Sequence, residues 1–256
     1  CEKSRRLFLE NLDNLTLVEL NEEMLQIYLT LTYVAGENTF FRGLKKLMPG
    51  RYLVWKNGRL TITRYWKPEF HPDESKTLEE WADEIHSTIQ EIMPEVKDKN
   101  ETAESFLSGG VDSSYVLAMS DAEVTDSCGY EEPRFDESPL AKQTADLLGR
   151  KNNRCLITPE EYFGIVPYVM YNMEQPLGDA SAIAFAIACR ATAEHTKLCY
   201  SGEGADEFFG GYNMYRNAER YGDNLKTFYV GNTNIMKEDE KKRILKKYDP
   251  DVLPIE

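Results

Sequence analysis

The stretch Ser108-Gly109-Gly110-Val111-Asp112-Ser113 decides the fold. It follows a short apolar run at residues 103–107 and opens a helical pattern over residues 112–119. Two glycines let the backbone approach an anion closely and adopt positive φ, and the serines and the N–H groups of a new helix donate hydrogen bonds. We therefore predict a strand, a phosphate-binding turn and a helix in this order, and we call residues 108–113 the phosphate turn.

Short apolar runs alternate with helical patterns on the C-terminal side of the phosphate turn as well. This alternation predicts parallel strands joined by crossover helices, and hence an α/β fold. The expected strands are residues 103–107, 124–129, 154–157 and 198–200. The expected helices are 78–92, 112–119, 137–148, 159–173, 182–194 and one that begins at residue 205 and continues past 212.

The first third of the chain has a different character. Apolar residues recur at helical spacing over residues 21–34, and two strand-like runs flank Asn57-Gly58, a strong hairpin signal. Residues 67–76 contain two prolines and several charges without periodicity, which favours a linker. We therefore expect two domains, residues 1–67 and residues 77–256.

A second glycine-containing turn, Ser201-Gly202-Glu203-Gly204-Ala205-Asp206-Glu207, follows the apolar run 198–200. We call residues 201–207 the acidic turn. Its three carboxylates would repel a phosphate unless a divalent cation bridges them or one carboxylate moves a proton. Asp112 and Asp206 are the natural pair for magnesium. Taken alone, the acidic turn is also typical of a solvated helix N-terminus, where the helix dipole favours negative charge.

Composition limits the class of protein and its partners. The formal charge of −14 argues against nucleic-acid or anionic-membrane partners, which require a basic face. The five cysteines include no C-x-x-C pair and predict reduced thiols. No signal peptide or bilayer-length apolar run is visible, so we expect a cytoplasmic protein. The lysine- and glutamate-rich tail 236–248 predicts a solvated helix with Ile244 and Leu245 as its few apolar anchors.

Both turns carry a family resemblance. The phosphate turn matches the Ser-Gly-Gly-x-Asp-Ser signature of ATP pyrophosphatases, and the absence of G-x-x-x-x-G-K-[ST] excludes a Walker loop. Residues 201–212 closely resemble the Ser-Gly-Glu-Gly-(Ser/Ala)-Asp-Glu block of glutamine-dependent asparagine synthetases, followed by the same Gly-Gly-Tyr. The resemblance implies a parallel-sheet ATP pyrophosphatase domain preceded by the hairpin-containing end of an N-terminal-nucleophile glutaminase domain.

The resemblance also implies ligands and residue roles. ATP and Mg²⁺ would be the cofactors, aspartate and ammonia or glutamine the substrates, and a homodimer is compatible with the intact protein. Glu203 would be the catalytic carboxylate near the acyl-adenylate, and Glu207 would hold the substrate amino group. The ATP-binding residues would be Leu107, Ser108, Gly109, Gly110, Asp112, Ser113, Cys128, Ser201 and Gly202, and the metal ligands Asp112 and Asp206.

Two further segments resemble the family. Residues 175–181 resemble its substrate-facing loop, which makes Asp179 and Ser181 substrate candidates, although such residues also end loops and cap helices. Residues 135–138 resemble its Asp-Glu-Ser helix entry, where capping alone explains the residues and we assign no catalysis.

The ends of the chain depart from the family. Residues 44–66 resemble the end of the glutaminase domain, yet Cys1 is followed by Glu2-Lys3 where the family's nucleophile is followed by glycine. We therefore reject Cys1 as a nucleophile. The family's Arg-x-Pro-Phe-Leu-Asp block and catalytic lysine do not occur in the sequence. We expect a fragment truncated at both ends.

Three functions remain open at this stage. The first is asparagine synthesis from aspartate through β-aspartyl-AMP, which ammonia attacks. The second keeps the adenylating chemistry but amidates or cyclises another carboxylate, as β-lactam synthetases do. The third is a nucleotide-binding fragment without turnover.

Overall fold

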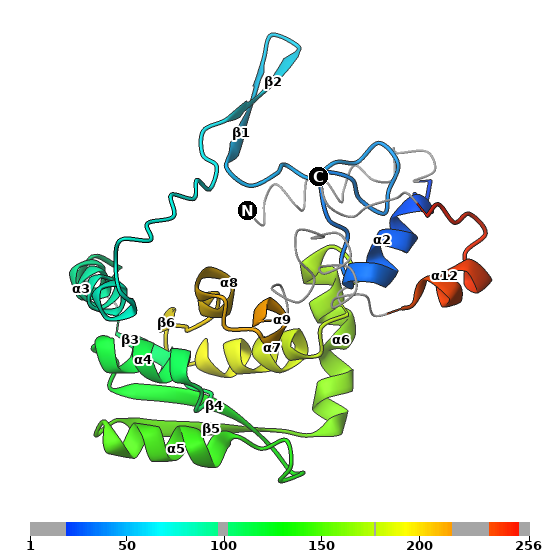
Figure 1. Ribbon diagram of the computed structural model, residues 1–256. Helices are drawn as coiled ribbons and strands as arrows, with labels where there is room; N and C mark the ends of the chain where they lie inside the picture. Colours follow the sequence, from blue (N-terminus) through cyan, green and yellow to red (C-terminus); the bar gives the residue numbers. More distant parts are fainter. Residues whose placement is uncertain (1–18, 97–101, 177, 217–235, 251–256) are drawn as a thin grey trace. The chain divides into compact units, whose positions relative to one another are not determined.

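The computed structural model describes residues 19–96, 102–176, 178–216 and 236–250 (Figure 1). The chain divides into two compact units. The first contains residues 1–70, 175–178 and 221–256, and the second contains residues 71–174 and 179–220. The division into domains 1–67 and 77–256 stays a prediction, and the segment that begins at Cys1 lies outside the described residues.

The second unit is built on a four-stranded parallel sheet. Its strands are β3 (Ala103–Phe106), β4 (Val124–Tyr130), β5 (Lys151–Ile157) and β6 (Leu198–Tyr200), in the spatial order β5-β4-β3-β6 (Figure 1). Each neighbouring pair runs parallel. The predicted parallel α/β fold is therefore confirmed, and β5 begins three residues earlier than the sequence pattern indicated.

Two apolar layers hold helices against the two faces of this sheet. On one face α4 (Val111–Met119) packs over β3 and α5 (Ser138–Leu147) packs over β5 and β4, with α3 (Leu78–Val96) against α4. On the other face α7 (Ser181–Thr192) packs over β4 and β5, and α6 (Pro159–Met173) packs on α7. The first layer is Ala103, Leu107, Leu117, Ala122, Ala141, Ala145 and Tyr200, and the second is Ile157, Ile165, Val169, Ile183 and Ile187.

The strand order creates a crevice at one edge of the sheet. The chain moves outward from β3 through β4 to β5 and then crosses back to place β6 on the other side of β3. The connection that leaves β3 and the connection that enters β6 therefore run on opposite faces of the sheet, which opens a crevice outside the carboxyl ends of these strands. The phosphate turn follows β3 and the acidic turn follows β6, so the topology brings both turns to this edge.

The prediction of one continuous helix from residue 205 past residue 212 is wrong. The structure has α8 (Ala205–Phe209) and α9 (Asn213–Arg216), separated at Gly210, whose φ is 66°. The backbone N–H groups of Gly210 and Gly211 both bond to the carbonyl of Asp206. Helices commonly end at a glycine in the left-handed region. The apolar residues Phe208 and Phe209 before Gly210 had suggested that the helix continues.

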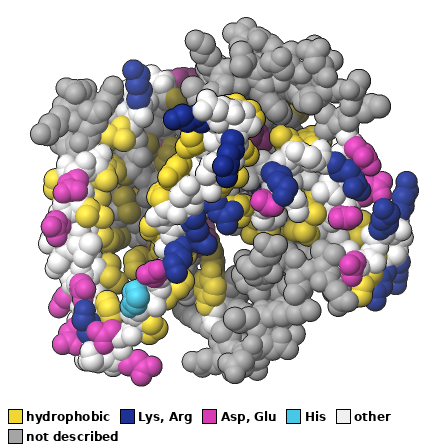
Figure 2. All heavy atoms as spheres, turned by 90° about the horizontal axis from the view of Figure 1, so that it is seen from above, with side chains coloured by type: hydrophobic (Ala, Val, Ile, Leu, Met, Phe, Trp, Pro, Cys, Tyr) yellow, Lys and Arg dark blue, Asp and Glu magenta, His cyan; other side chains and the backbone are white. Residues whose placement is uncertain are grey.

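The first unit contains the predicted β-hairpin. β1 (Arg51–Lys56) pairs antiparallel with β2 (Arg59–Arg64), and Asn57 and Gly58 turn between them with φ of 52° and 75°. Positive φ at both central residues is the mirror-image turn that matches strand twist. Apolar hairpin side chains such as Trp55 are exposed, and Figure 2 shows apolar surface lying open between charged side chains.

A buried lysine corrects the expectation for the C-terminal tail. α12 (Glu238–Ile244) forms as predicted, but of the two expected anchors Ile244 is 59% exposed and Leu245 is only half-buried. Lys241 is fully buried instead, and its Nζ donates to Thr30 Oγ1 of α2 (Glu23–Leu31) at 2.6 Å and to Glu238 Oε1 at 2.7 Å. A buried ammonium requires such partners, so a polar contact holds this helix.

Among the described helices, none combines the length and apolarity needed to cross a bilayer.

The core assignment is testable with two leucines. Leu117 is 0% exposed in the first apolar layer, whereas Leu147 at the end of α5 is 88% exposed. We expect Leu117→Ala to lower the free energy of unfolding by about 2–5 kcal/mol, because it removes buried methyl groups and leaves a cavity. Leu147→Ala should change it by less than about 0.5 kcal/mol. Urea denaturation measures both, and equal losses would contradict the assignment.

Candidate functional site

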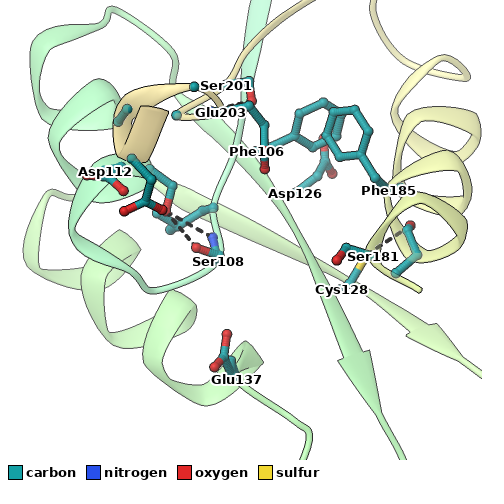
Figure 3. Close-up of a pocket in the computed structure, with 18 of the residues that line it drawn as sticks. Phe106, Ser108, Asp112, Asp126, Cys128, Glu137, Ser181, Phe185, Ser201 and Glu203 are labelled. Carbon is teal, nitrogen blue, oxygen red and sulfur yellow. Dashed lines mark hydrogen bonds between the residues drawn. The ribbon is translucent and has the colours of Figure 1, made fainter. Parts of the chain in front are cut away.

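A cavity of about 570 Å³ lies at the carboxyl ends of the central strands (Figure 3). Its walls come from the end of β3 and the phosphate turn, from β4, from α7 and from the acidic turn. Figure 3 shows Ser108 and Asp112 on one side with Ser201 and Glu203 above them, Phe106 and Asp126 in the middle, and Phe185 and Ser181 on the other side. Of the predicted site residues, those lining the cavity are Leu107, Ser108, Asp112, Ser113, Cys128, Ser181, Ser201, Gly202, Glu203, Asp206 and Glu207.

The phosphate turn is held by its own hydrogen bonds. The hydroxyls of Ser108 and Ser113 lie 2.9 Å apart, and Ser113 Oγ also accepts from the backbone N–H of Ser108 at 3.2 Å. The N–H of Gly110 donates to Ser108 Oγ at 3.2 Å. These bonds fix the loop between β3 and α4 in a compact form before any ligand arrives.

The start of α4 offers donors to an anion. Its N-cap residue, Gly110, has extended dihedrals (φ −74°, ψ 167°) and provides no side-chain cap. The first intrahelical bond runs from Ser114 N to Gly110 O. The N–H groups of residues 111–113 therefore have no partner within the helix, which makes this end suitable for a phosphate.

Gly109 and Gly110 do not line the cavity, and Gly109 has a packing role. A Cβ at Gly109 would lie 2.8 Å from Leu140 Cβ and 2.9 Å from the backbone N of Ala141. Its φ of 86° is also in the left-handed region. Only glycine lets the phosphate turn pass this close to the start of α5.

Close packing at Gly202 joins the acidic turn to the phosphate turn. A Cβ at this position would lie 2.7 Å from the backbone N of Ser113 and 2.8 Å from the carbonyl carbon of Asp112. Such distances are too short for any side chain, so the backbone of the acidic turn lies directly against the first turn of α4. Residues almost a hundred positions apart in the sequence therefore form one side of the cavity.

The acidic turn presents its carboxylates to the cavity. Glu203 is exposed, and its backbone N–H donates to Ser201 Oγ at 3.2 Å. Tyr212 Oη donates to Glu207 Oε1 at 2.7 Å. This hydrogen bond, with smaller contributions from burial and from the charges of Glu207, Asp206 and Glu203, raises the pKa of Tyr212 to about 12.

The predicted magnesium ligands fit a hard cation in chemistry. Asp112 and Asp206 both line the cavity and both offer carboxylate oxygen, which is the donor that Mg²⁺ prefers beside substrate phosphates. Within the described residues, the one cluster of three close donor groups lies elsewhere, at Glu104, Asp126 and His195. A magnesium ion at Asp112 and Asp206 would therefore depend on phosphate oxygens to complete its shell.

Leu107 and Cys128 end their strands beside the cavity. Leu107 is buried, and its N–H donates to the carbonyl of Asp126 at 2.9 Å. Burial is the main cause that raises the pKa of the Cys128 thiol to about 11, and its Sγ donates to the carbonyl of Ala184. Cys128 is thus a neutral packing thiol rather than a nucleophile. It is one of four free, half-buried cysteines in the described chain, and Cys1 lies outside it.

The two substrate candidates before α7 differ in position. Ser181 lines the cavity, and its N–H and hydroxyl donate to Asp179 Oδ1 at 2.9 and 2.7 Å. Asp179 does not line the cavity. Its carboxylate caps the start of α7, so the structure gives it a role in orienting Ser181.

Several cavity residues are absent from the sequence-based set. Phe106 and Phe185 form a tilted pair with ring centroids 5.1 Å apart. Period-two alternation in β3 could have placed Phe106 on the α7 face, but nothing local pairs it with Phe185. Asp136 Oδ1 accepts from the N–H and the hydroxyl of Ser138 at the start of α5, whereas the N-cap residue Glu137 makes no side-chain cap bond and lines the cavity. The other lining residues missed are Asp126, Tyr130, Phe135, Tyr162, Ala180, Ala184, Ala188, Gly204, Ala205 and Tyr212.

Comparison with known proteins gives consistent relatives. The family described as asparagine synthase matches residues 84–251. Asparagine synthetase (glutamine-hydrolyzing) 1 of Bacillus subtilis is 31% identical over 92% of this chain and 43% of its own length. A putative asparagine synthetase of Mycobacterium tuberculosis is 29% identical over 77% of this chain and 32% of its length. Amidase chry2 of Gibberella zeae is 30% identical over 70% of this chain and 30% of its length.

Coverage differs between the chain and these relatives. The chain spans less than half the length of each of the three. Among solved structures, an NH3-dependent NAD synthetase from Campylobacter jejuni aligns with a TM-score of 0.35 and 15% identity, over 64% of this chain and 83% of that one. That likeness is too low to support a conclusion.

The contact between Tyr212 and Glu207 predicts a titration difference. Replacing Glu207 by Ala removes both the hydrogen-bond acceptor and the charge, so the pKa of Tyr212 should fall from about 12 towards the ordinary value of about 10. At about pH 11 Tyr212 would then be ionised in the variant and neutral in the native chain. Ultraviolet absorbance of tyrosinate, with Tyr212→Phe subtracted in each background, measures this. Glu203→Ala serves as the control with a smaller effect, and an unchanged titration in Glu207→Ala would refute the contact.

Proposed function

Since this chain belongs to the asparagine synthase family, we propose that its parent protein makes asparagine from aspartate, ATP and ammonia. Family membership supports ATP-dependent amidation chemistry. In the proposed reaction a side-chain carboxylate oxygen of aspartate attacks the α-phosphorus of ATP, and pyrophosphate leaves. Ammonia, derived from glutamine in the intact protein, attacks the acyl carbon of β-aspartyl-AMP, AMP leaves and a proton is lost.

The observation that supports this proposal most is the backbone contact between the two turns. Gly202 lies against the first turn of α4, so the donors of the phosphate turn and the carboxylates of the acidic turn share one cavity. An adenylating enzyme needs this combination, because it must bind a polyphosphate and a carboxylate side by side. A phosphate turn without the acidic turn would bind a nucleotide only.

We assign the nucleotide to the phosphate-turn side of the cavity. The N–H groups that open α4, with the hydroxyls of Ser108 and Ser113, would donate to the β- and γ-phosphates. Ser201 and Gly202 would contact the nucleoside, and the backbone beside Leu107 and Cys128 would face adenine. Asp112 and Asp206 would hold magnesium, which when bound would neutralise charge on the phosphates.

We assign the acceptor carboxylate to the acidic-turn side. Glu203 is exposed at the cavity, where a carboxylate could accept a proton from the attacking ammonia. Glu207, oriented by Tyr212, would bind the amino group of aspartate. Ser181 lies across the cavity and would donate to the substrate, with Asp179 orienting its hydroxyl.

The first unit fits a role as the end of a glutaminase domain. The hairpin β1–β2 exposes apolar side chains along both strands, and among the described strands each of the two pairs only with the other. Such a hairpin is marginal alone and belongs in a larger sheet. We propose that residues 1–67 are the C-terminal part of that domain and that the parent protein is cytoplasmic.

A different acyl acceptor is the second candidate. The α7 side of the cavity is aromatic, with Phe106, Phe185, Tyr130 and Tyr162 among its lining residues. Such a wall suits a carboxylate larger and less polar than aspartate. One relative bears the name amidase rather than asparagine synthetase. Adenylation of such an acceptor would use the same turns and change only the substrate.

Because Gly202 packs against α4, replacing it by alanine should weaken nucleotide binding. Gly202→Ala should weaken binding of ATP with Mg²⁺ to this chain by at least about tenfold, or about 1.4 kcal/mol, because the Cβ would push the acidic turn off α4. Calorimetry measures the affinity. Gly164→Ala in α6 is the matched control, since nothing lies within 4 Å of its Cβ, and it should bind as the native chain does. Native-like binding by Gly202→Ala would disprove the shared site.

The reaction itself is tested on the parent protein. Pyrophosphate release should depend on aspartate and ammonium, and Glu203→Gln should lower turnover by about 10²–10⁴-fold while ATP binding persists. Glu160→Gln, an exposed change on α6 away from the cavity, should leave both unchanged. Release that responds to another carboxylate and not to aspartate would favour the second candidate. ATP binding with no release for any carboxylate would favour a nucleotide-binding protein without turnover.

A further inference from the structure

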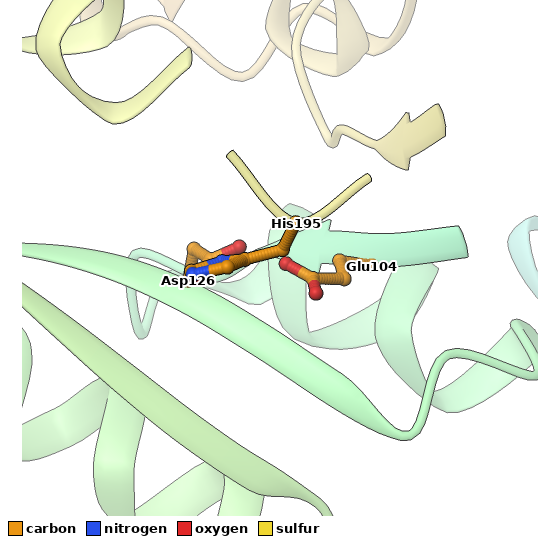
Figure 4. A group of neighbouring side chains, drawn as sticks. All are labelled: Glu104, Asp126 and His195. Carbon is orange, nitrogen blue, oxygen red and sulfur yellow. The ribbon is translucent and has the colours of Figure 1, made fainter. Parts of the chain in front are cut away.

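A second cluster of ionisable side chains lies beneath α7, outside the two turns (Figure 4). Glu104 belongs to β3, Asp126 to β4, and His195 follows the end of α7. One donor atom from each residue lies within 4.8 Å of the other two. Figure 4 shows the imidazole of His195 reaching over the sheet towards both carboxyl groups.

One oxygen of this cluster is buried without a partner. Glu104 is 8% exposed, and its Oε2 accepts no hydrogen bond from any described residue. Among the described residues, Glu104 also takes part in no ion pair. A buried carboxylate oxygen left unsatisfied destabilises the fold, so this atom points to a ligand.

The second carboxylate is fixed in position. Asp126 is 7% exposed, Oδ2 accepts from Thr192 Oγ1 at 2.9 Å, and Oδ1 accepts from Asn153 Nδ2 at 3.2 Å. Each oxygen keeps a lone pair after these bonds. Partners of this kind orient metal ligands in proteins.

The electrostatics of the cluster call for positive charge. Donor atoms of the two buried carboxyl groups lie within 4.8 Å of each other, and burial is the main cause that raises the pKa of Glu104 to about 7. A divalent ion would neutralise charge between these carboxyl groups and would supply the missing partner of Glu104 Oε2.

We propose that Glu104, Asp126 and His195 bind a divalent transition-metal ion of the Zn²⁺ type. Two carboxylates and one imidazole form a donor set typical of zinc, with solvent completing the shell. His195 is exposed, which gives the ion a path of entry. The site is separate from the oxygen-only pair Asp112 and Asp206, where magnesium would bind beside phosphates.

The position of the ion gives it a structural role. It would link β3, β4 and the end of α7, and α7 supplies Ser181 and Phe185 to the cavity wall. Asp126 itself also lines the cavity. The ion would thus fix one wall of the cavity from behind without touching the phosphate turn.

Zinc binding by the chelator-treated chain tests this inference, with excess Mg²⁺ present. Calorimetry should show one Zn²⁺ per chain with micromolar or tighter affinity, and the thermal midpoint should rise with added zinc. His195→Gln should weaken binding by at least about tenfold, and so should Glu104→Gln. His71→Gln is the matched control and should bind as the native chain does. His195 is exposed, so its replacement leaves the fold intact even if the Glu104 variant does not fold.

Cobalt substitution separates this site from the thiols. Co²⁺ should give visible ligand-field bands that His195→Gln removes, without a sulfur-to-cobalt charge-transfer band. Equal zinc affinity of native chain and His195→Gln, or a thiolate band, would overturn the proposal. Binding of ATP with Mg²⁺ is measured on the same samples, so loss of the zinc site is distinguishable from failure of the nucleotide site.

Discussion

The close approach of Gly202 to the first turn of α4 is the constraint on which the rest of the site depends. Parallel strands β3 and β6 lie side by side, so the turns that follow them emerge at the same edge. They can touch because position 202 has no side chain. Gly109 repeats this on the other side, where the phosphate turn lies against α5. The glycines of both turns therefore serve backbone packing as much as ligand access, and the phosphate turn is held between two neighbours.

Local patterns predicted the elements of the fold because their causes are local. Asn57-Gly58 favours one type of hairpin turn whatever surrounds it. The order of strand, glycine-containing turn and helix occurs at both the phosphate turn and the acidic turn. The sequence pattern gave a wrong prediction where one backbone conformation or one residue far away in the sequence determines the local structure. Gly210 stops a helix that the apolar residues before it would continue. Lys241 belongs to a charged helix, and only its distant partner Thr30 shows that it is buried.

The sequence predicted the site residues that lie in the two turns. It did not predict the site residues that lie on the strands of the sheet or on the helix packed over it. Residues of the phosphate turn and the acidic turn follow strands directly, so their common edge follows from the parallel order. Phe106 and Phe185 meet across the face of the sheet, and no spacing in the sequence pairs them. Glu104 and Asp126 were missed for a related reason, since central parallel strands are expected to be apolar, and neither residue lies near a recognisable motif.

The two groups of carboxylates in the second unit therefore differ in how strongly solvent stabilises their charge. Those of the acidic turn face an open cavity, where water solvates their charge and a dense acidic segment is tolerated. Glu104 and Asp126 lie within the sheet, where both are buried, and burial is the main cause that raises the pKa of Glu104 to about 7. Asp126 is also bonded to Thr192 in α7, the helix that forms the far wall of the cavity. A ligand bound to this buried pair would therefore act on the α7 wall of the cavity, even though the pair lies outside both turns.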